Sequence, residues 1–563
     1  MTITTTTGER LGRILQTCPI WAACAIIFVL TLLCFGWRLG DSPLARTEGH
    51  RALPAHIMAT TGDWLIPRLC NEVYLRKPAG HYWVLASFEK LTGRADEWSW
   101  RMPSVLAFAT LAAFLAAMAG RWFGPIAAWV AGGGCFALVA LWAQTRSADI
   151  DAMNTLASVV ACCALLEVGF GASRRRWLWS ALAFIGFASV LMLKGPGGLP
   201  LPLGALVGGS AANRKWRWLL HPLCWTPLFA GAAVSGGWAW AVHRAIAIQH
   251  LQTDMGGVHE AINGMLRFRR AGKALGMAVQ LLVFGLPATI SVLALPSLWR
   301  GDDPRWGAIS ASNREAEARS SMLRATTGAI IAATALYVIS GVVNPRYAYP
   351  ILPLTALPAG AAASAWADGI LPERTRGRFK TAMFIMLIAA PCAQLGFTLR
   401  IWHDACAPIQ LLAAGIACMA AAAAGIQQLR RGSIRNAGLM ILILFAALTF
   451  PMSEWQAQTR IRESALNAAR MVQGIVNPSE TLVTGEYIRN KPELFLYVDR
   501  PVNSLGGRLR KPFDLEKSCW VIFSREEWDA WKAEKGNRFS QVVEIPIYRS
   551  MAILAHYEAP GRR

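Results

Sequence analysis

Residues 103–120 read PSVLAFATLAAFLAAMAG, a run that contains no charged side chain. A helix of about 20 apolar residues crosses the hydrocarbon core of a bilayer, so this run approaches the length of a membrane span. Comparable runs lie near residues 19–37, 124–143, 152–171, 177–193, 198–212, 219–242, 275–298, 325–343, 349–367, 380–399, 407–427 and 437–451. We therefore predict a polytopic α-helical membrane protein with about 13 transmembrane helices.

The overall composition supports the same class. The 563 residues are 54% hydrophobic and only 16% charged, whereas soluble domains carry about 25% charged residues. The net charge is +22, but the basic residues are scattered among apolar runs, which argues against nucleic acid as a partner. The sequence has no CxxC pair and no Cys/His spacing typical of metal ligands, so no metal site is expected from it.

Basic residues also predict the orientation. Lys and Arg crowd into alternate connections between the predicted spans, at residues 174–176, 214–217, 374–380 and 430–435. The positive-inside rule assigns these connections and the N-terminus to the cytoplasm. An odd number of spans then places the C-terminus outside. The first connection, residues 38–102, is also outside despite its many basic residues, because long loops translocate largely regardless of charge.

The chain becomes polar after the last predicted span. Residues 452–563 alternate strand-like runs (481–484, 494–497, 520–523 and 542–547) with helical runs (463–476 and 525–534). This alternation predicts a small α/β domain of about 100 residues on the outer side. The chain would thus consist of a membrane domain, residues 1–451, and a C-terminal extracytoplasmic domain, residues 452–563.

Charged and aromatic residues gather in four outward segments next to the spans. Such residues are costly near a bilayer and usually serve a function. Each segment alone has a structural explanation, such as a helix cap for the aspartates or an interfacial anchor for the tyrosines. The segments contain Glu48, His50, Arg51, Tyr74, Arg76, Lys77 and Tyr82, then Asp149 and Asp151, then Lys194, and finally Arg346, Tyr347 and Tyr349.

Taken together, these residues suit a reaction with a phosphate leaving group. Carboxylates can act as a general base, and Lys and Arg neutralise charge that develops on a departing phosphate. Arginine adds bidentate contacts to phosphate oxygens. Because the outer membrane face has no supply of nucleotide sugars, an activated group would most simply arrive there on a lipid.

The first connection resembles a known family. Residues 47–83, TEGHRALPAHIMATTGDWLIPRLCNEVYLRKPAGHYW, are similar to the first outer loop of the ArnT-like and protein O-mannosyltransferase-like glycosyltransferases, which have the GT-C membrane fold. LKGPGGLPLP at 193–202 and NPRYAYPILPL at 344–354 follow in that family's order. The resemblance implies sugar transfer from a polyprenyl-phosphate-sugar to an extracytoplasmic acceptor, either a lipid A-like glycolipid, a polysaccharide or a protein. It also implies contact with membrane lipids and a place in the bacterial inner membrane.

The resemblance implies roles for single residues. Family members carry an Asp-Glu pair where this chain has Thr47-Glu48, so Glu48 is the expected base and Asp151 the next candidate. Arg76 replaces an acidic residue that is linked to zinc in the aminoarabinose transferases, so that metal site is not expected. The expected contacts to donor phosphate are Arg76, Lys77, Lys194 and Arg346, and the expected contacts to substrate are His50, Arg51, Tyr74, Tyr82, Asp149, Tyr347 and Tyr349.

Two other classes of protein remain as alternatives. A transporter or lipid flippase would line a route with midplane charges and often contains repeats, but here the charges lie at span ends and no repeat stands out. A structural role in an envelope assembly would leave the one-sided set of charges unexplained. Within the transferase interpretation, the segment between His243 and Lys273 is expected to close over the site as an outer loop.

Overall fold

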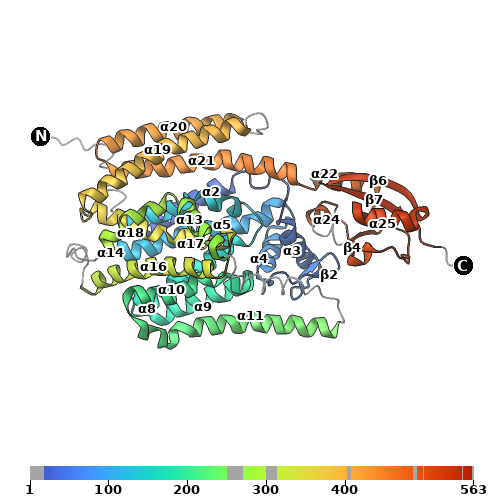
Figure 1. Ribbon diagram of the computed structural model, residues 1–563, viewed down its shortest axis with the longest axis horizontal. Helices are drawn as coiled ribbons and strands as arrows, with labels where there is room; N and C mark the ends of the chain where they lie inside the picture. The colour runs from blue at the N-terminus through green and yellow to red at the C-terminus, as the bar shows by residue number, and fades with distance from the viewer. Residues whose placement is uncertain are drawn as a thin grey trace.

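The computed structural model describes residues 18–249, 271–299, 313–401, 408–485, 491–498, 500–547 and 550–560. The segment expected to close over the site lies mostly outside these residues. Figure 1 shows a bundle of helices with a small sheet domain at one end. The main bundle helices are α2 (Ile20–Gly36), α5 (Glu97–Phe123), α6 (Pro125–Phe136), α8 (Asp151–Phe170), α9 (Arg176–Leu193), α10 (Pro200–Asn213), α11 (Pro222–Ile248), α13 (Ala271–Phe284), α16 (Asn313–Ile339), α18 (Ala356–Ala367), α19 (Glu373–Ile401), α20 (Pro408–Arg430) and α21 (Ile434–Glu463).

The prediction of a multi-pass helical membrane protein is confirmed. Among the described residues, seven helices are long and apolar enough to cross a membrane, and four shorter helices are apolar as well. The count of 13 spans stays a prediction, because several expected spans are interrupted. Residues 349–367 divide into α17 (Ile351–Leu354) and α18. This run contains Pro350, Pro353 and Pro358, and proline lacks the N–H that a continuous helix needs.

The first connection folds into two short helices and a small hairpin. They are α3 (Gly49–Thr61), α4 (Gly80–Thr92), β1 (Arg68–Leu69) and β2 (Glu72–Val73). Helix α3 ends at Gly62, whose φ of 77° lies in the left-handed region that favours glycine. In Figure 1, α3 and α4 lie between the bundle and the C-terminal domain.

The C-terminal α/β domain is confirmed. Its five-stranded sheet has the order β4-β3-β5-β7-β6, in which β3 is parallel to β4 and β5, and β7 is antiparallel to β5 and β6. Helix α21 runs to Glu463 without a break, past the boundary predicted at residue 452. The elements are β3 (Leu482–Gly485), β4 (Val502–Gly506), β5 (Cys519–Ser524), β6 (Phe539–Ile547), β7 (Ser550–Tyr557), α22 (Leu466–Ile475), α24 (Glu493–Val498) and α25 (Arg525–Lys535).

One secondary-structure prediction in this domain was wrong. Residues 494–497 were expected to form a strand, but they lie in helix α24. Leu494, Phe495 and Val498 are buried, a spacing that puts them on one face of a helix. An apolar run this short does not distinguish helix from strand by its periodicity alone. Strands β4 and β7 were not predicted at all.

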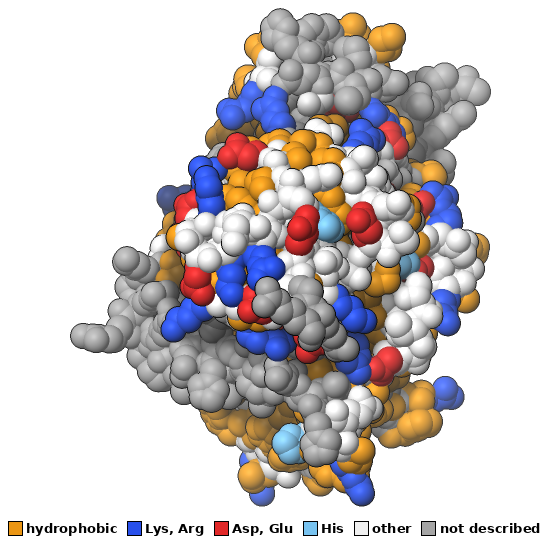
Figure 2. All heavy atoms as spheres, turned by 90° about the vertical axis from the view of Figure 1, so that its right-hand side faces the viewer, with side chains coloured by type: hydrophobic (Ala, Val, Ile, Leu, Met, Phe, Trp, Pro, Cys, Tyr) orange, Lys and Arg blue, Asp and Glu red, His pale blue; other side chains and the backbone are white. Residues whose placement is uncertain are grey.

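The C-terminal domain shares a hydrophobic core with the first connection. Ala52 and Ala55 of α3 are fully buried in the same apolar cluster as Ala469 of α22 and Leu494 and Phe495 of α24. Such shared burial is what holds two packed layers together. The sheet domain is therefore docked on the part of the chain that carries the predicted site residues. Figure 2, which looks onto this end, shows Lys, Arg, Asp and Glu side chains spread over the face.

Candidate active site

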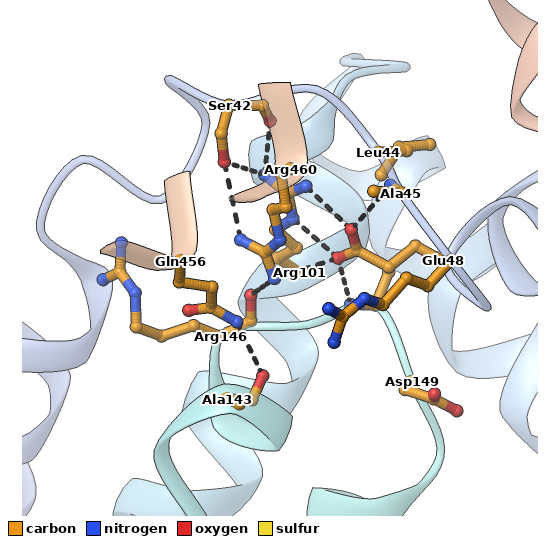
Figure 3. A network of polar contacts seen from close by, with 12 residues as sticks. Ser42, Leu44, Ala45, Glu48, Arg101, Ala143, Arg146, Asp149, Gln456 and Arg460 are labelled. Carbon is orange, nitrogen blue, oxygen red and sulfur yellow. Dashed lines mark hydrogen bonds and ion pairs between the residues drawn. The ribbon is translucent and has the colours of Figure 1, made fainter. Parts of the chain in front are cut away.

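Glu48 lies at the centre of a closed network of ionic contacts, shown in Figure 3. Its side chain accepts hydrogen bonds from Arg101 at both oxygens, at 2.8 and 2.9 Å. The backbone N–H groups of Ala45 and Ala148 donate to the same carboxylate, each at 3.1 Å, and Arg460 approaches at 3.3 Å. Only 2% of Glu48 is exposed. We call Glu48, Arg101 and Arg460 the Glu48 cluster.

The two arginines also tie the surrounding backbone together. Arg101 donates to the carbonyl oxygens of Leu39 at 3.0 Å and Ser42 at 2.7 Å. Arg460 donates to the carbonyl oxygen of Arg146. Burial alone would raise the pKa of Glu48, but the charges of Arg101 and Arg460 outweigh it and lower this pKa to about 2. The cluster thus fixes a permanently ionised carboxylate among four chain segments.

A second set of charges lies beside the Glu48 cluster. Arg346 bridges Asp149 and Asp151, with Nη2 on the first carboxylate and Nε on the second. Lys194 Nζ binds the other oxygen of Asp151 at 2.9 Å. About 35% of the Arg346 side chain is exposed, against 5% and 7% for the two aspartates. Arg346 therefore forms the outer side of this group.

Asp149 has two further partners from the first connection. The Thr47 hydroxyl donates to it at 2.6 Å, and Arg51 Nε lies 3.5 Å from its other oxygen. Burial opposes ionisation, but Arg51 and Arg346 hold the pKa of Asp149 well below its usual range. We call Asp149, Asp151, Arg51, Lys194 and Arg346 the aspartate cluster.

Lys77 is a further cation beside the aspartate cluster. Burial, Arg51 and Lys194 lower its pKa, while Asp151 and Asp149 act in the opposite direction. Lys77 makes no ion pair with any residue that the structure describes. Positive groups thus outnumber the two carboxylates, which is the charge balance of an anion site.

Local structure explains how distant residues meet here. Asp151 begins α8, where the positive end of the helix dipole favours a carboxylate. Lys194 follows α9, directly before a tight turn in which Gly195 has a φ of 69°. Arg346 lies in a short 3-10 helix (Pro345–Ala348), whose first turn is capped when the Asn344 side chain accepts from Arg346 N at 3.0 Å. The second, third and fourth predicted segments therefore converge.

The predicted aromatic contacts fall into two groups. The Tyr82 hydroxyl is buried and accepts from Arg51 Nη1 at 3.4 Å, and the Tyr347 ring lies 5.0 Å from Lys194 Nζ. These two rings adjoin the aspartate cluster. Tyr349 lies next to the same turn and packs its ring edge-on against Phe284 at 6.4 Å.

Tyr74, His50 and Arg76 form a second group, which adjoins the first where the Tyr74 ring lies 6.4 Å from that of Tyr82. Tyr74 hydrogen-bonds His50 Nδ1 at 3.2 Å with the rings stacked, and the Arg76 guanidinium lies 5.9 Å from the Tyr74 ring centroid. Arg76 is exposed, and the contact that the structure shows for it is with this ring. It therefore differs from Lys77, its neighbour in sequence, which faces the aspartate cluster.

Sequence reasoning missed Arg101 and Arg460. Both lie at the ends of apolar helices, a placement that marks a buried cation with a partner. Thr47 was noted only as a missing carboxylate, not as a hydrogen-bond donor to Asp149. In the described part of the chain, no three His, Cys, Asp or Glu side chains come together as a metal-binding group.

The chain is similar to known proteins in part of its sequence and in its fold. Residues 76–240 match the family described as dolichyl-phosphate-mannose-protein mannosyltransferase. The structure is similar to that of ArnT from Cupriavidus metallidurans bound to undecaprenyl phosphate, with a TM-score of 0.70 and 17% identity over 94% of this chain and 97% of that chain. The chain has the ArnT-like GT-C fold. The apo form of ArnT gives the same TM-score at 18% identity.

The resemblance seen in the sequence is thereby confirmed. The ArnT-like fold extends over the C-terminal domain, because the match covers nearly all of both chains. The matched family segment, residues 76–240, includes five of the charged residues predicted for the site, namely Arg76, Lys77, Asp149, Asp151 and Lys194.

Proposed function

We propose that this protein is a membrane glycosyltransferase that moves a sugar from a polyprenyl-phosphate donor to an acceptor outside the cytoplasm. The aspartate cluster is the observation that carries the proposal. Its cations, with Lys77 beside them, exceed its carboxylates at a partly exposed position next to the membrane helices. A lipid-linked phosphate supplies the missing negative charge. The ArnT structure with bound undecaprenyl phosphate supports a lipid-phosphate carrier in this fold.

In this proposal the donor phosphate binds between Lys77, Lys194 and Arg346. Two of these cations, Lys194 and Arg346, form ion pairs with Asp151. The phosphate oxygens compete for them, because they offer arginine the same bidentate geometry as a carboxylate. Binding of the donor therefore draws the cations away from Asp151. Its carboxylate becomes free to accept a proton only when the donor phosphate, which is the leaving group, is bound.

Asp151 then acts as the general base. It accepts the proton of the acceptor hydroxyl while the hydroxyl oxygen attacks the anomeric carbon of the sugar. The bond between that carbon and the phosphate oxygen breaks, and the electron pair leaves with the polyprenyl phosphate, whose charge Lys77 and Arg346 stabilise. Attack opposite the leaving group inverts the anomeric configuration.

Glu48 has a different place in this mechanism from the one that the resemblance implied. Its two oxygens already accept hydrogen bonds from three arginine nitrogens and two backbone N–H groups, and its pKa of about 2 makes it a weak proton acceptor. We assign it to positioning. It holds Ala148, and hence Asp149, in register with the first connection.

The aromatic residues and Arg76 complete the proposed site. Tyr347 and Tyr349 lie beside Arg346 and are placed to contact the sugar. His50, Tyr74 and Arg76, of which Arg76 is exposed, would contact the acceptor. The protein would work in a bacterial inner membrane, with its N-terminus in the cytoplasm and its C-terminal domain outside.

The donor half of the proposal is tested by binding. The full-length protein in lipid nanodiscs is titrated with undecaprenyl phosphate and, as a matched control, with undecaprenol, which lacks the phosphate. We expect thermal stabilisation by the first lipid only, and we expect Lys77→Ala to reduce it. Equal stabilisation by both lipids would show that the cluster does not recognise phosphate.

The transfer half is tested in membranes. Envelope glycolipids and glycoproteins are compared by mass spectrometry between cells with the gene, without it, and with Asp151→Asn. A sugar that depends on the gene and on Asp151 identifies the acceptor. A product formed equally by the Asp151→Asn protein would remove Asp151 from the reaction.

A further inference from the structure

Glu493 is a buried acid at the seam between the C-terminal domain and the first connection. It begins α24 and is 0% exposed, and neither of its carboxylate oxygens has a hydrogen-bond partner among the residues that the structure describes. A Cβ atom added to Gly49 would lie 2.5 Å from the Glu493 backbone nitrogen and 2.7 Å from its Oε2. The Glu493 carboxyl therefore lies against the backbone of the residue that follows Glu48.

Other polar groups at this seam are paired. The Tyr497 hydroxyl accepts from Leu44 N at 2.5 Å and donates to Glu97 at 2.7 Å. Ser504 N donates to the Asn71 side chain at 2.6 Å. Glu493 differs from these groups, because its carboxyl group lies at the seam without a hydrogen-bond partner in the described part of the chain.

Chemistry decides which form of Glu493 fits there. Burying an unpaired carboxylate costs far more free energy than burying the neutral acid. Burial raises the pKa of Glu493 to about 7, the backbone N–H of Glu493 itself and then Lys491 oppose this rise, and nearby Glu48 adds to it. On the elements packed against α24, the other titratable groups are three on α3 and one on α22. His50, Arg51 and His56 of α3 contact Tyr74, Asp149 and Glu89, respectively, and Arg470 of α22 is exposed. Tyr497 in α24 itself is bound to Glu97.

We propose that Glu493 is a positioning residue that makes docking of the C-terminal domain on residues 47–51 depend on its protonation. The neutral acid fits against Gly49, and the carboxylate does not. Residues 47–51 contain Thr47 and Arg51, which bind Asp149, as well as Glu48. The domain thereby acts on both charged clusters without contributing a reacting group.

The direction of the pH effect follows from linkage. The pKa of Glu493 is about 7 when docked and near 4.5 when free, so docking is strongest below pH 4.5. As the pH rises from there through 7, docking weakens about tenfold per unit, by about 300-fold in all. Above pH 7, ionisation of Glu493 does not weaken docking any further, because the residue is then ionised in both the docked and the free state.

Hydrogen–deuterium exchange of the full-length protein in nanodiscs tests the proposal. Exchange of peptides from residues 44–58 is compared between the parent and Glu493→Gln at the same pH, about 5 and about 8, so that the intrinsic pH dependence of exchange cancels. The amide of glutamine stays neutral. We expect the parent to be only a few-fold less protected than Glu493→Gln at the lower pH and up to about 300-fold less protected at the higher pH.

Two further variants make the result specific. Gly49→Ala adds the clashing Cβ and should lower protection at both pH values. Glu534→Gln, on an exposed face of the same domain, should follow the parent. Parallel protection of the parent and Glu493→Gln across the range would overturn the proposal. Because exchange needs no substrate, a protein without transfer activity would sink the proposed function and leave this inference standing.

Discussion

The Glu48 cluster and the aspartate cluster are adjacent, but they differ in whether their carboxylates can still accept a proton from a substrate. The same short segment serves both, since Ala148 N donates to Glu48 while Asp149 and Asp151 face Arg346. In the first cluster one carboxylate receives two arginines and two backbone N–H groups, all buried. In the second, cations are in excess and Arg346 reaches the surface. An acidic residue beside an active site is thus a base only if its lone pairs become available.

Glu48→Gln should give the largest effect on stability. It leaves Arg101 and Arg460 buried against a neutral amide, and breaking a buried ion pair costs about 3–5 kcal/mol. We expect a lower unfolding temperature in detergent and reduced yield from membranes. Glu544→Gln, the same substitution in an exposed pair with Arg525, should cost less than about 1 kcal/mol. If Glu48→Gln unfolds like the control but loses transfer, Glu48 is catalytic and the contrast between the clusters fails.

Asp151→Asn should act on turnover rather than on folding. Loss of a general base lowers the rate by about 10²–10³-fold. Arg346 keeps Asp149 as a partner and has access to water, and the asparagine oxygen can still accept from buried Lys194, so the loss of stability should be smaller than for Glu48→Gln, which affects two arginines. The measurement is the rate of sugar transfer at saturating donor, alongside the unfolding temperature. Near-normal turnover, or a stability loss as large as that of Glu48→Gln, would contradict the assignment of Asp151.

Lys77→Ala should weaken donor binding by about tenfold or more, because it removes a charge-assisted contact to phosphate. Its matched control is Arg76→Ala, which removes an adjacent cation that contacts the Tyr74 ring instead. The dissociation constant for undecaprenyl phosphate should rise for the first variant and stay nearly unchanged for the second. Equal losses would mean that the loop binds phosphate by its net charge alone.

Much of the fold could be predicted because the membrane imposes it. Long apolar runs specify helices whatever their partners are, and Gly62 and Gly195 mark real turns. Interruptions such as that between α17 and α18 depend on where neighbouring helices re-satisfy freed backbone groups, which no local pattern encodes. Helix α24 was mistaken for a strand because its apolar residues pack on α22 and α3, a tertiary contact.

The sequence predicted which charged residues come together, but it did not predict that they divide into two clusters. Charges near span ends identified Asp149, Asp151, Lys194 and Arg346 correctly as one group, since all lie where helices end on one side. The sequence does not show that Glu48 turns toward Arg101 and Arg460, because those partners come from residues 53 and 412 positions away. Pairing over such separations is decided by packing.

Substitution of Thr47 should have the smallest effect on turnover among these predictions. It also compares the two clusters most directly, because Thr47 is next to Glu48 in the sequence. Its hydroxyl donates to Asp149 at 2.6 Å, and Thr47→Val removes that bond while keeping the shape of the side chain. A typical hydrogen bond contributes about 0.5–1.5 kcal/mol, so we expect turnover to fall by up to about tenfold, with the unfolding temperature almost unchanged. Thr47→Ser, which keeps the hydroxyl, should retain most activity. Thr47 and Glu48 are adjacent in sequence yet belong to different clusters. If Thr47→Val lowers stability while turnover holds, the aspartate cluster is also structural, and the proposed base must lie elsewhere.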